Sequence, residues 1–429
     1  MGSTEAAIRT LEELLQTLGG FSQGSPGVTR LVYSDAWCEA HRWLAATARE
    51  LGLAATPDAV GNLYFHDPSV QPGDLRRSVL MVGSHLDTVP CDGFYDGAYG
   101  VLAALQVTAE LGDRPALPVV GFASCAGEEC RFSQCNPGVH GLLGLVRREE
   151  LEFVRDRDGV TWARSLELAR ARGCAAALAD GDHPCPALFH PALMLELHVE
   201  QGALLESEGL DLGIVEQVSG CRRMRVMLTG EARYAGTTPM ALRRDTLVAA
   251  AEMVLAVERL ARKAGPPAVA TAGTLRVEPG NFNTVPGVCE LGIEVRHAAR
   301  PKLVELTAVV GQQCRAIAEN RGLEVVLEES PGLEPVALSP ALVIAAEQLA
   351  RRLKISHRRM ASGAAHDAMV FARNGVPSLL LFVPSRHGVS QSPDEFTAPA
   401  QLATGERFLL EFVRWLTDAR GERPPTYAG

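Results

Sequence analysis

The strongest constraint on the fold is a set of four short apolar runs separated by helix-like segments. The runs are SVLMVGS (78–84), LPVVGFAS (117–124), ALMLELH (192–198) and PSLLLFVPS (377–385). Each has the length of a strand and near-continuous hydrophobicity, which is typical of strands covered on both faces. Because intervening segments such as residues 100–112 have a helical pattern, we expect a layered α/β fold.

Residues 213–328 have a different pattern. Half-exposed strand patterns and two strong helix patterns follow one another there in the order β-α-β-β-α-β, which suits a small α+β sandwich. We therefore expect a larger domain built from residues 1–212 and 329–429, with residues 213–328 inserted into it as a second domain.

Polar residues that can hold a metal ion follow all four apolar runs. They are His85 and Asp87, with Asp96 in the next loop; Glu128 and Glu129; His198 and Glu200; and His387, Ser390, Gln391 and Glu395. Ligand sites of open α/β sheets form in the crevice beyond the carboxyl ends of the strands. Imidazole and carboxylate groups are good ligands for Zn²⁺ or Mn²⁺, so the pattern predicts a site for a divalent cation.

Two of these sequence positions also suggest roles beside the metal. The pair Glu128–Glu129 suits a division of labour in which one carboxylate binds metal and the other is a general base. Asp87 lies two residues after His85 and can orient its second ring nitrogen, as carboxylates commonly do for ligating histidines. Each motif alone is more often an ordinary loop or surface feature, and the metal prediction depends on their joint placement.

Composition excludes several other classes of protein. The formal net charge is −10, and no basic stripe with interleaved aromatic residues occurs, which argues against a nucleic-acid partner. The N-terminus has no basic segment followed by an apolar stretch, so it does not resemble a secretory signal. No apolar run approaches the roughly 18 residues of a membrane span. We expect a cytoplasmic enzyme with a small-molecule substrate.

Nine motifs, taken in order, resemble those of the M20 metallopeptidase-like amidases of the hydantoinase/carbamoylase branch. They are GSHLDTVP, DGAYGVLAAL, GEECRF, LELHVEQG, YAGTTPM, NFNTVPG, EVRH, SGAAHDAM and VPSRHGVSQSPDEFT. The resemblance spans nearly the whole chain. It implies a catalytic domain of the di-metal exopeptidase type, an inserted lid domain that also forms homodimers, and hydrolysis of carbamoyl or ureido C–N bonds of amino-acid-like substrates.

The resemblance also implies roles for single residues. In the catalytic domain, His85 and His198 would hold one metal with Asp96 bridging, and Glu129 would hold a second metal. Glu128 would be the general base, and Asp87 would support His85. On the substrate side, Gln217, Asn283 and Arg296 match positions that bind the carboxylate and ureido groups. Gly363 and Ala365 fall in the glycine-rich substrate loop, where Ala365 replaces a usual glycine.

Three departures from the family pattern alter the expected site. Tyr234 replaces a histidine that helps to stabilise the oxyanion across the dimer, and a tyrosine carries no positive charge. Gln391 replaces the last ligand of the second metal, and a carboxamide oxygen is a poor zinc ligand, so we expect one Zn or Mn ion, with the second ion weak, different or absent. The segment VPCDGFYDG brings Cys91 and Asp92 close to the first metal.

Three hypotheses follow from this pattern. The first is an amidohydrolase that uses His85, Asp96, His198 and Glu128 on an unusual substrate. The second is a diverged enzyme that runs a transfer or condensation, because two hydrolytic groups are changed while Gln217, Asn283 and Arg296 are kept. The third is a non-catalytic binding protein, which the survival of the first metal site disfavours.

Overall fold

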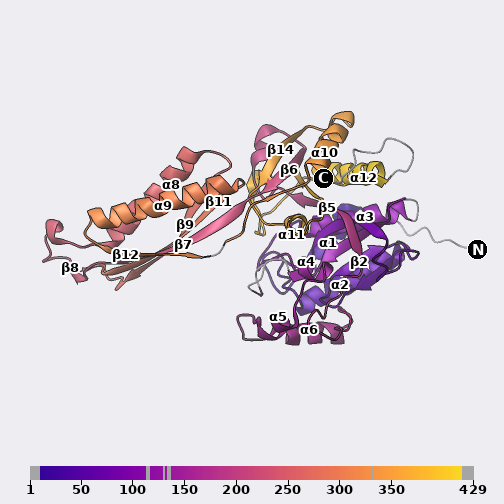
Figure 1. Ribbon diagram of the computed structural model, residues 1–429, viewed down its shortest axis with the longest axis horizontal. Coiled ribbons are helices and arrows are strands. Elements are labelled where there is room, and N and C mark those ends of the chain that lie inside the picture. Colours follow the sequence, from indigo (N-terminus) through magenta and orange to yellow (C-terminus); the bar gives the residue numbers. More distant parts are fainter. Residues whose placement is uncertain (1–9, 113–115, 129–130, 133–136, 331, 418–429) are drawn as a thin grey trace, which may run out of the picture. The chain divides into compact units, whose positions relative to one another are not determined.

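A computed structural model describes residues 10–112, 116–128, 131–132, 137–330 and 332–417 (Figure 1). The chain divides into two compact units. The first unit contains residues 1–216, 337–360 and 366–429, and the second contains residues 217–336 and 361–365. Among the described residues, no helix has the length and apolar character needed to cross a membrane.

A nine-stranded sheet forms the centre of the first unit. Its strands lie in the order β1-β2-β4-β3-β5-β15-β6-β13, with β14 paired to β6. Their bounds are β1 Ala54–Pro57, β2 Leu63–His66, β3 Ser78–His85, β4 Val119–Ser124, β5 His190–Val199, β6 Leu212–Val218, β13 Val336–Ala337, β14 His357–Ser362 and β15 Ser378–Val383.

The four apolar runs of the sequence are the adjacent central strands β4, β3, β5 and β15. These strands pair in parallel, and nearly all of their residues are buried. The prediction of four covered strands in an α/β fold is confirmed. Because the strands are parallel neighbours, their carboxyl ends lie at one edge of the sheet, and the polar residues that follow them gather there.

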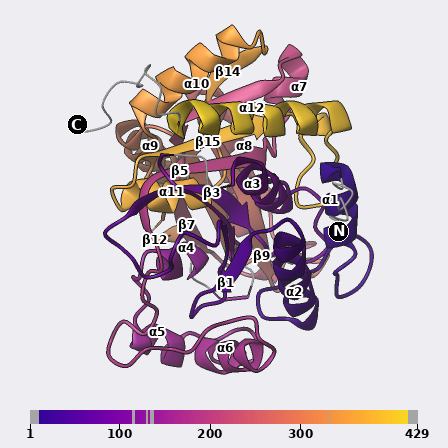
Figure 2. The same ribbon diagram turned by 90° about the vertical axis from the view of Figure 1, so that its right-hand side faces the viewer.

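Helices cover both faces of these central strands. On one face, α3 (Ala98–Leu111) packs on β3, β4 and β5 and contacts α12 (Pro399–Thr417). On the other face, α11 (Asp367–Arg373) contacts β5 and β15. The helices α3, α11 and α12 can be followed around the sheet in Figure 2. The remaining helices of this unit are α1 Leu11–Gly19, α2 Asp35–Glu50, α4 Pro137–Leu142, α5 Arg148–Phe153, α6 Trp162–Ala171, α7 Leu204–Glu208 and α10 Pro340–Arg352, with a 3-10 turn at Arg386–Gly388.

The second unit is a four-stranded antiparallel sheet with two long helices on one face. The strand order is β12-β7-β11-β9, and α8 and α9 lie along the sheet (Figure 1). The bounds are β7 Gly220–Thr229, α8 Thr246–Ala264, β9 Val269–Glu278, β11 Val288–His297, α9 Arg300–Asn320 and β12 Glu324–Ser330. Alternate residues of β7 and β11 are buried against the helices, which is the period-2 pattern of a sheet with one covered face.

A short ribbon extends the second unit. Its two strands are β8 (Arg233–Tyr234) and β10 (Thr284–Val285), and a 3-10 turn at Met240–Leu242 follows β8. The role of this unit as a lid and dimerisation domain stays a prediction.

Candidate metal centre

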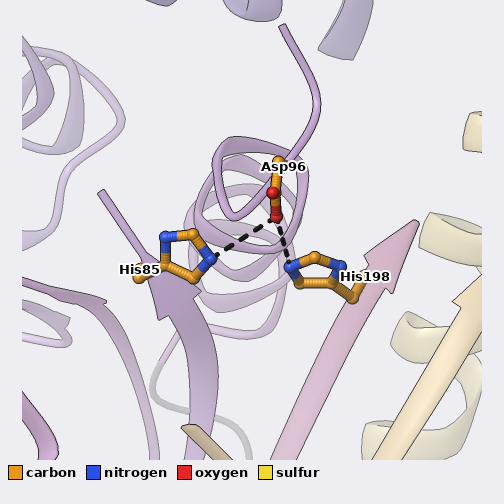
Figure 3. A group of neighbouring side chains, drawn as sticks. All are labelled: His85, Asp96 and His198. Atoms are coloured by element: carbon orange, nitrogen blue, oxygen red, sulfur yellow. Dashed lines mark ion pairs between the residues drawn. The ribbon is translucent and has the colours of Figure 1, made fainter. Parts of the chain in front are cut away.

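The ends of β3 and β5 bring two histidines to one carboxylate. Nε2 of His198 lies 3.1 Å from Oδ1 of Asp96, and Nε2 of His85 lies 3.6 Å from the same oxygen. Figure 3 shows both rings pointing at this atom from neighbouring strands. All three side chains are buried, and they form a group whose spacing can hold a metal ion.

The hydrogen bonds of the two rings leave each Nε2 atom unprotonated, with a lone pair that can bind a metal ion. Nδ1 of His198 lies 2.9 Å from the carbonyl oxygen of Val199, and Nδ1 of His85 lies 3.0 Å from that of Asp87. A carbonyl can only accept, so each Nδ1 carries the proton. The N–H of Gly97 donates to Nε2 of His198 at 3.2 Å, which also requires a lone pair there.

Asp96 is fixed by contacts that leave its Oδ1 without a donor. Gln201 donates to Oδ2 at 3.0 Å. Oε2 of Glu395 accepts the N–H groups of Tyr95 and Asp96 at 3.0 and 3.2 Å, which pins the loop before α3. Within the described part of the chain, no hydrogen-bond donor is directed at Oδ1 of Asp96.

The electrostatics of the group also suit a cation. Burial lowers the pKa of both histidines, but the negative charges of the neighbouring carboxylates outweigh it, so the pKa of His85 lies well above its ordinary value and that of His198 is raised. Burial opposes ionisation of Asp96, but His198 and His85 outweigh it and lower its pKa. A buried carboxylate thus faces two imidazole lone pairs and needs positive charge between them, which a divalent cation supplies.

Glu128 and Asp87 adjoin this group after β4 and β3. Asp87 accepts the N–H of Gly127 at 2.7 Å and that of Glu128 at 3.3 Å, so its carboxylate shapes the loop that carries the predicted base. Oδ1 of Asp87 lies 3.4 Å from Nδ1 of His85, while its carbonyl oxygen lies closer to that nitrogen. Burial, then nearby acids, raise the pKa of Glu128 to about 7. Glu129 lies outside the described residues.

Gln391 contacts the predicted base, whereas His387 and Glu200 have partners outside the predicted cluster. Gln391 donates to both carboxylate oxygens of Glu128, at 3.2 and 3.3 Å. The backbone N–H of exposed His387 donates to Glu206 at 2.6 Å. Glu200 accepts the N–H groups at the start of α7, at 2.8 Å each, so it caps that helix.

The predicted substrate residues lie in the second unit, in two separate places. Tyr234 is in β8 opposite Thr284, and the N–H of Ala235 donates to the carbonyl oxygen of Asn283 at 2.8 Å, so Tyr234 and Asn283 share the ribbon. Arg296 lies one residue before the end of β11, where it donates to Glu294 at 2.6 Å and to the carbonyl oxygen of Gly363 at 2.7 Å.

The other two substrate-side residues have less defined surroundings. Gln217 lies in β6 and is partly buried, and Ala365 is exposed just before α11. The roles predicted for all these residues stay predictions.

Two contacts of the site were not predicted from the sequence. Gln201, three residues after His198, contacts Asp96 from a left-handed backbone with φ of 59°. Glu196, two residues before His198, is buried and accepts a hydrogen bond from Ser84. Both lie in the LELHVEQG motif, and their nearness to His198 in the sequence was the available signal.

Comparison with known families adds one strong match. The model of peptidase family M20/M25/M40 matches residues 81–415. An N-carbamoyl-L-amino-acid amidohydrolase of Paenarthrobacter aurescens is 34% identical over 96% of this chain and 98% of that protein. An allantoate amidohydrolase of Bacillus subtilis is 33% identical, covering 96% and 97%. A ureidoglycolate hydrolase of Arabidopsis thaliana is 32% identical, covering 93% and 84%.

Solved structures agree with these sequence matches. A hydantoinase/carbamoylase family amidase from Burkholderia multivorans has a TM-score of 0.83 and 30% identity, covering 94% of this chain and 96% of that chain. A structure described as AtUAH in complex with (S)-hydroxyglycine has a TM-score of 0.74 and 27% identity, covering 95% and 97%.

Proposed function

The chain belongs to peptidase family M20/M25/M40, and on that premise we propose that it is a metal-dependent amidohydrolase. Its substrate would be an amino-acid-like molecule cleaved at a carbamoyl, ureido or related amide C–N bond. The observation that carries the proposal is the meeting of two imidazole Nε2 atoms at Oδ1 of Asp96, a buried oxygen with no donor directed at it among the described residues. The named relatives support the bond type, since they are amidohydrolases and a ureidoglycolate hydrolase.

His85, Asp96 and His198 would hold the cation, with Zn²⁺ and Mn²⁺ both suited to these ligands. When bound, such an ion supplies a Lewis acid that makes water more acidic and polarises a carbonyl group. The Nδ1–H groups of both rings are held by backbone carbonyls, which keeps each Nε2 directed into the site.

Glu128 would take the proton from water and return it to the leaving nitrogen. Its pKa of about 7 places it near the pH at which a general base works best. Gln217, Asn283, Arg296, Gly363 and Ala365 would bind the substrate, and Tyr234 would donate a hydrogen bond to the developing oxyanion. Arg296 suits a carboxylate because its guanidinium forms paired hydrogen bonds.

The test is a hydrolysis screen over N-carbamoyl amino acids, allantoate and ureidoglycolate, with protein supplied with zinc or manganese. We expect turnover of at least one compound. In Glu128→Gln we expect a rate lower by roughly 10²–10⁴, the usual contribution of a general base, with unchanged metal content. Absence of turnover across the panel by metal-loaded protein would contradict the proposal.

A second candidate function is a transfer or condensation on a similar substrate. It is favoured by Tyr234 and Gln391, which replace an oxyanion-stabilising histidine and a metal ligand of the family pattern. The double variant Tyr234→His with Gln391→His should then hydrolyse a compound that the natural chain does not. Ordinary hydrolysis by the natural chain would rule this candidate out.

We also propose that two copies of the chain pair through residues 213–328. The second unit exposes large apolar side chains, among them Met240, Leu242 and Phe282, which are 75%, 66% and 112% exposed. Exposed apolar surface of this kind often marks an interface. Light scattering should give the mass of a dimer, and a monomer at micromolar concentration would contradict this part.

A further inference from the structure

Gln391 stands where the family pattern has a metal ligand, but its side chain is directed at a carboxylate. Its Nε2 lies 3.2 Å from Oε1 and 3.3 Å from Oε2 of Glu128. A carboxylate only accepts hydrogen bonds, so the amide must present its NH₂ group there, and its oxygen points elsewhere. An NH₂ group of an amide has no lone pair for a metal.

The loop that carries Gln391 is anchored on both sides of it. The N–H of Arg386 donates to the carbonyl oxygen of Phe396 at 2.8 Å, and its guanidinium lies 4.3 Å from the centre of the Phe396 ring. Ser390 donates to Glu395 at 3.2 Å, and Glu395 in turn holds the loop of Asp96. Gln391 is therefore presented to Glu128 from a loop tied to the metal centre.

The backbone at Gln391 supports the same conclusion. Its φ is 50°, in the left-handed region that costs a residue with a side chain about 1 kcal/mol or more. The hydrogen bonds of the loop hold this conformation, and it is the one that aims the amide at Glu128.

No neighbouring histidine takes over the missing ligand position. His387, the candidate closest in the sequence, is directed at Glu206, with Nδ1 3.7 Å from that carboxylate, and its side chain is 79% exposed. In the part of the chain that the structure describes, the metal-sized groups are His85–Asp96–His198, Glu196–His198–His366 and Asp92–Asp96–Glu395. The second and third groups share His198 or Asp96 with the first, and none of the three includes His387 or Glu128.

We propose that Gln391 is a positioning residue for Glu128 and that the centre formed by His85, Asp96 and His198 binds a single divalent cation. The kinetic part of this inference depends on the proposed function, whereas the metal count does not. The amide donors hold the base in one orientation, and the loss of the lone pair at position 391 removes a ligand of a second ion. Hydrolysis would then proceed with one cation and an amide-held base.

Metal content tests the inference first. Protein purified without chelator and dialysed against excess Zn²⁺ or Mn²⁺ should contain about one ion per chain. Gln391→Met, which has similar length but no donor, should contain the same. Gln391→His should bind about one further ion, because imidazole restores the ligand, and a count that stays at one in this variant would contradict the inference. Two tight ions in the natural chain, or loss of an ion in Gln391→Met, would overturn the inference.

Kinetics test the positioning role. In Gln391→Met we expect kcat to fall about 10-fold with little change in KM, since a lost hydrogen bond to a charged group has this size. His387→Ala is the matched control: it removes an exposed side chain from the same loop and should change neither kcat nor metal content. Unchanged kcat in folded Gln391→Met would refute the role. If the natural chain turns over no substrate, the proposed function fails, while the ion count in Gln391→His still decides this inference.

Discussion

The hydroxyl of Ser84 donates a hydrogen bond to Oε1 of Glu196 at 2.8 Å, inside the sheet and fully buried. The other oxygen of Glu196 accepts the N–H of Ala368 in α11, also at 2.8 Å. The contact joins β3 to β5 one residue before His85 and two residues before His198. The metal centre therefore depends on a buried acid that ties its two supporting strands to a helix.

Removal of Glu196 should be far more costly than removal of Ser84. Glu196→Leu leaves two buried donors unpaired and should lower the free energy of unfolding by about 3 kcal/mol, while Ser84→Ala removes one donor and should cost about 1 kcal/mol. Urea denaturation of both variants measures the difference. Equal losses would show that the acid does not hold the strands together.

Gly97 and Gly112 make a matched pair at the two ends of α3. Both have left-handed φ values, 65° and 58°, so alanine strains each backbone similarly. A Cβ at Gly97 would lie 2.4 Å from Cε1 of His85, whereas one at Gly112 meets nothing within 4 Å among the described residues. We expect Gly97→Ala to weaken zinc binding at least 10-fold and Gly112→Ala to leave it unchanged, as measured by competition with a chelating dye. Equal affinities would contradict the close packing of His85.

His41 should make the fold sensitive to acid. It is buried beside Trp37, and burial lowers its pKa to about 4. In the unfolded chain the pKa of this histidine is near 6.5. The free energy of unfolding is therefore highest above that pH, where His41 is neutral in both states, and it falls as the pH drops from 6.5 towards 4.

His41→Leu should remove this acid sensitivity. Between pH 8 and pH 5 the natural chain should lose about 2 kcal/mol of stability that the variant retains. Thermal or urea melts at both pH values measure it, and the variant at pH 8 serves as its own reference. A parallel decline in both proteins would contradict the assignment.

Tyr234 should limit the hydrolytic rate. It lies exposed in β8 beside Asn283, where the family pattern has histidine. An imidazole can carry positive charge towards an oxyanion and a phenol cannot, so Tyr234→His should raise kcat/KM on N-carbamoyl substrates about 10-fold. Tyr234→Phe is the control and should lower it. A slower Tyr234→His variant would mean that the phenol is adapted to another substrate.

The central strands of the fold could be predicted from the sequence, whereas some peripheral strands could not. The buried strands β3, β4, β5 and β15 were readable because an almost wholly apolar run has few alternatives, whereas β14, with the sequence HRRMAS, is polar and only half buried. The family resemblance was confirmed by the match over residues 81–415, and the predicted enzyme class agrees with the names of the relatives.

Only those residues of the metal centre that lie at the ends of strands could be predicted from the sequence. His85 and His198 follow directly from parallel neighbouring strands. The contacts of Gln201 and Gln391 depend on left-handed backbone angles in loops, which residue type does not determine for glutamine. Glu200 was predicted in the metal cluster because it lies two residues after His198. Its carboxylate instead accepts the N–H groups at the start of the helix that begins at Leu204.

Zinc or manganese content of the natural chain and of Asp96→Ala shows whether His85, Asp96 and His198 hold a cation. Both proteins would be dialysed against the metal, desalted and analysed by mass spectrometry of the elements, with circular dichroism to verify folding. We predict about one ion per natural chain and less than about a tenth of that in Asp96→Ala, because Asp96 supplies the only charge of the three ligands. A folded natural chain that stays free of metal, or an Asp96→Ala variant that retains it, would rule out a cation site at these three residues.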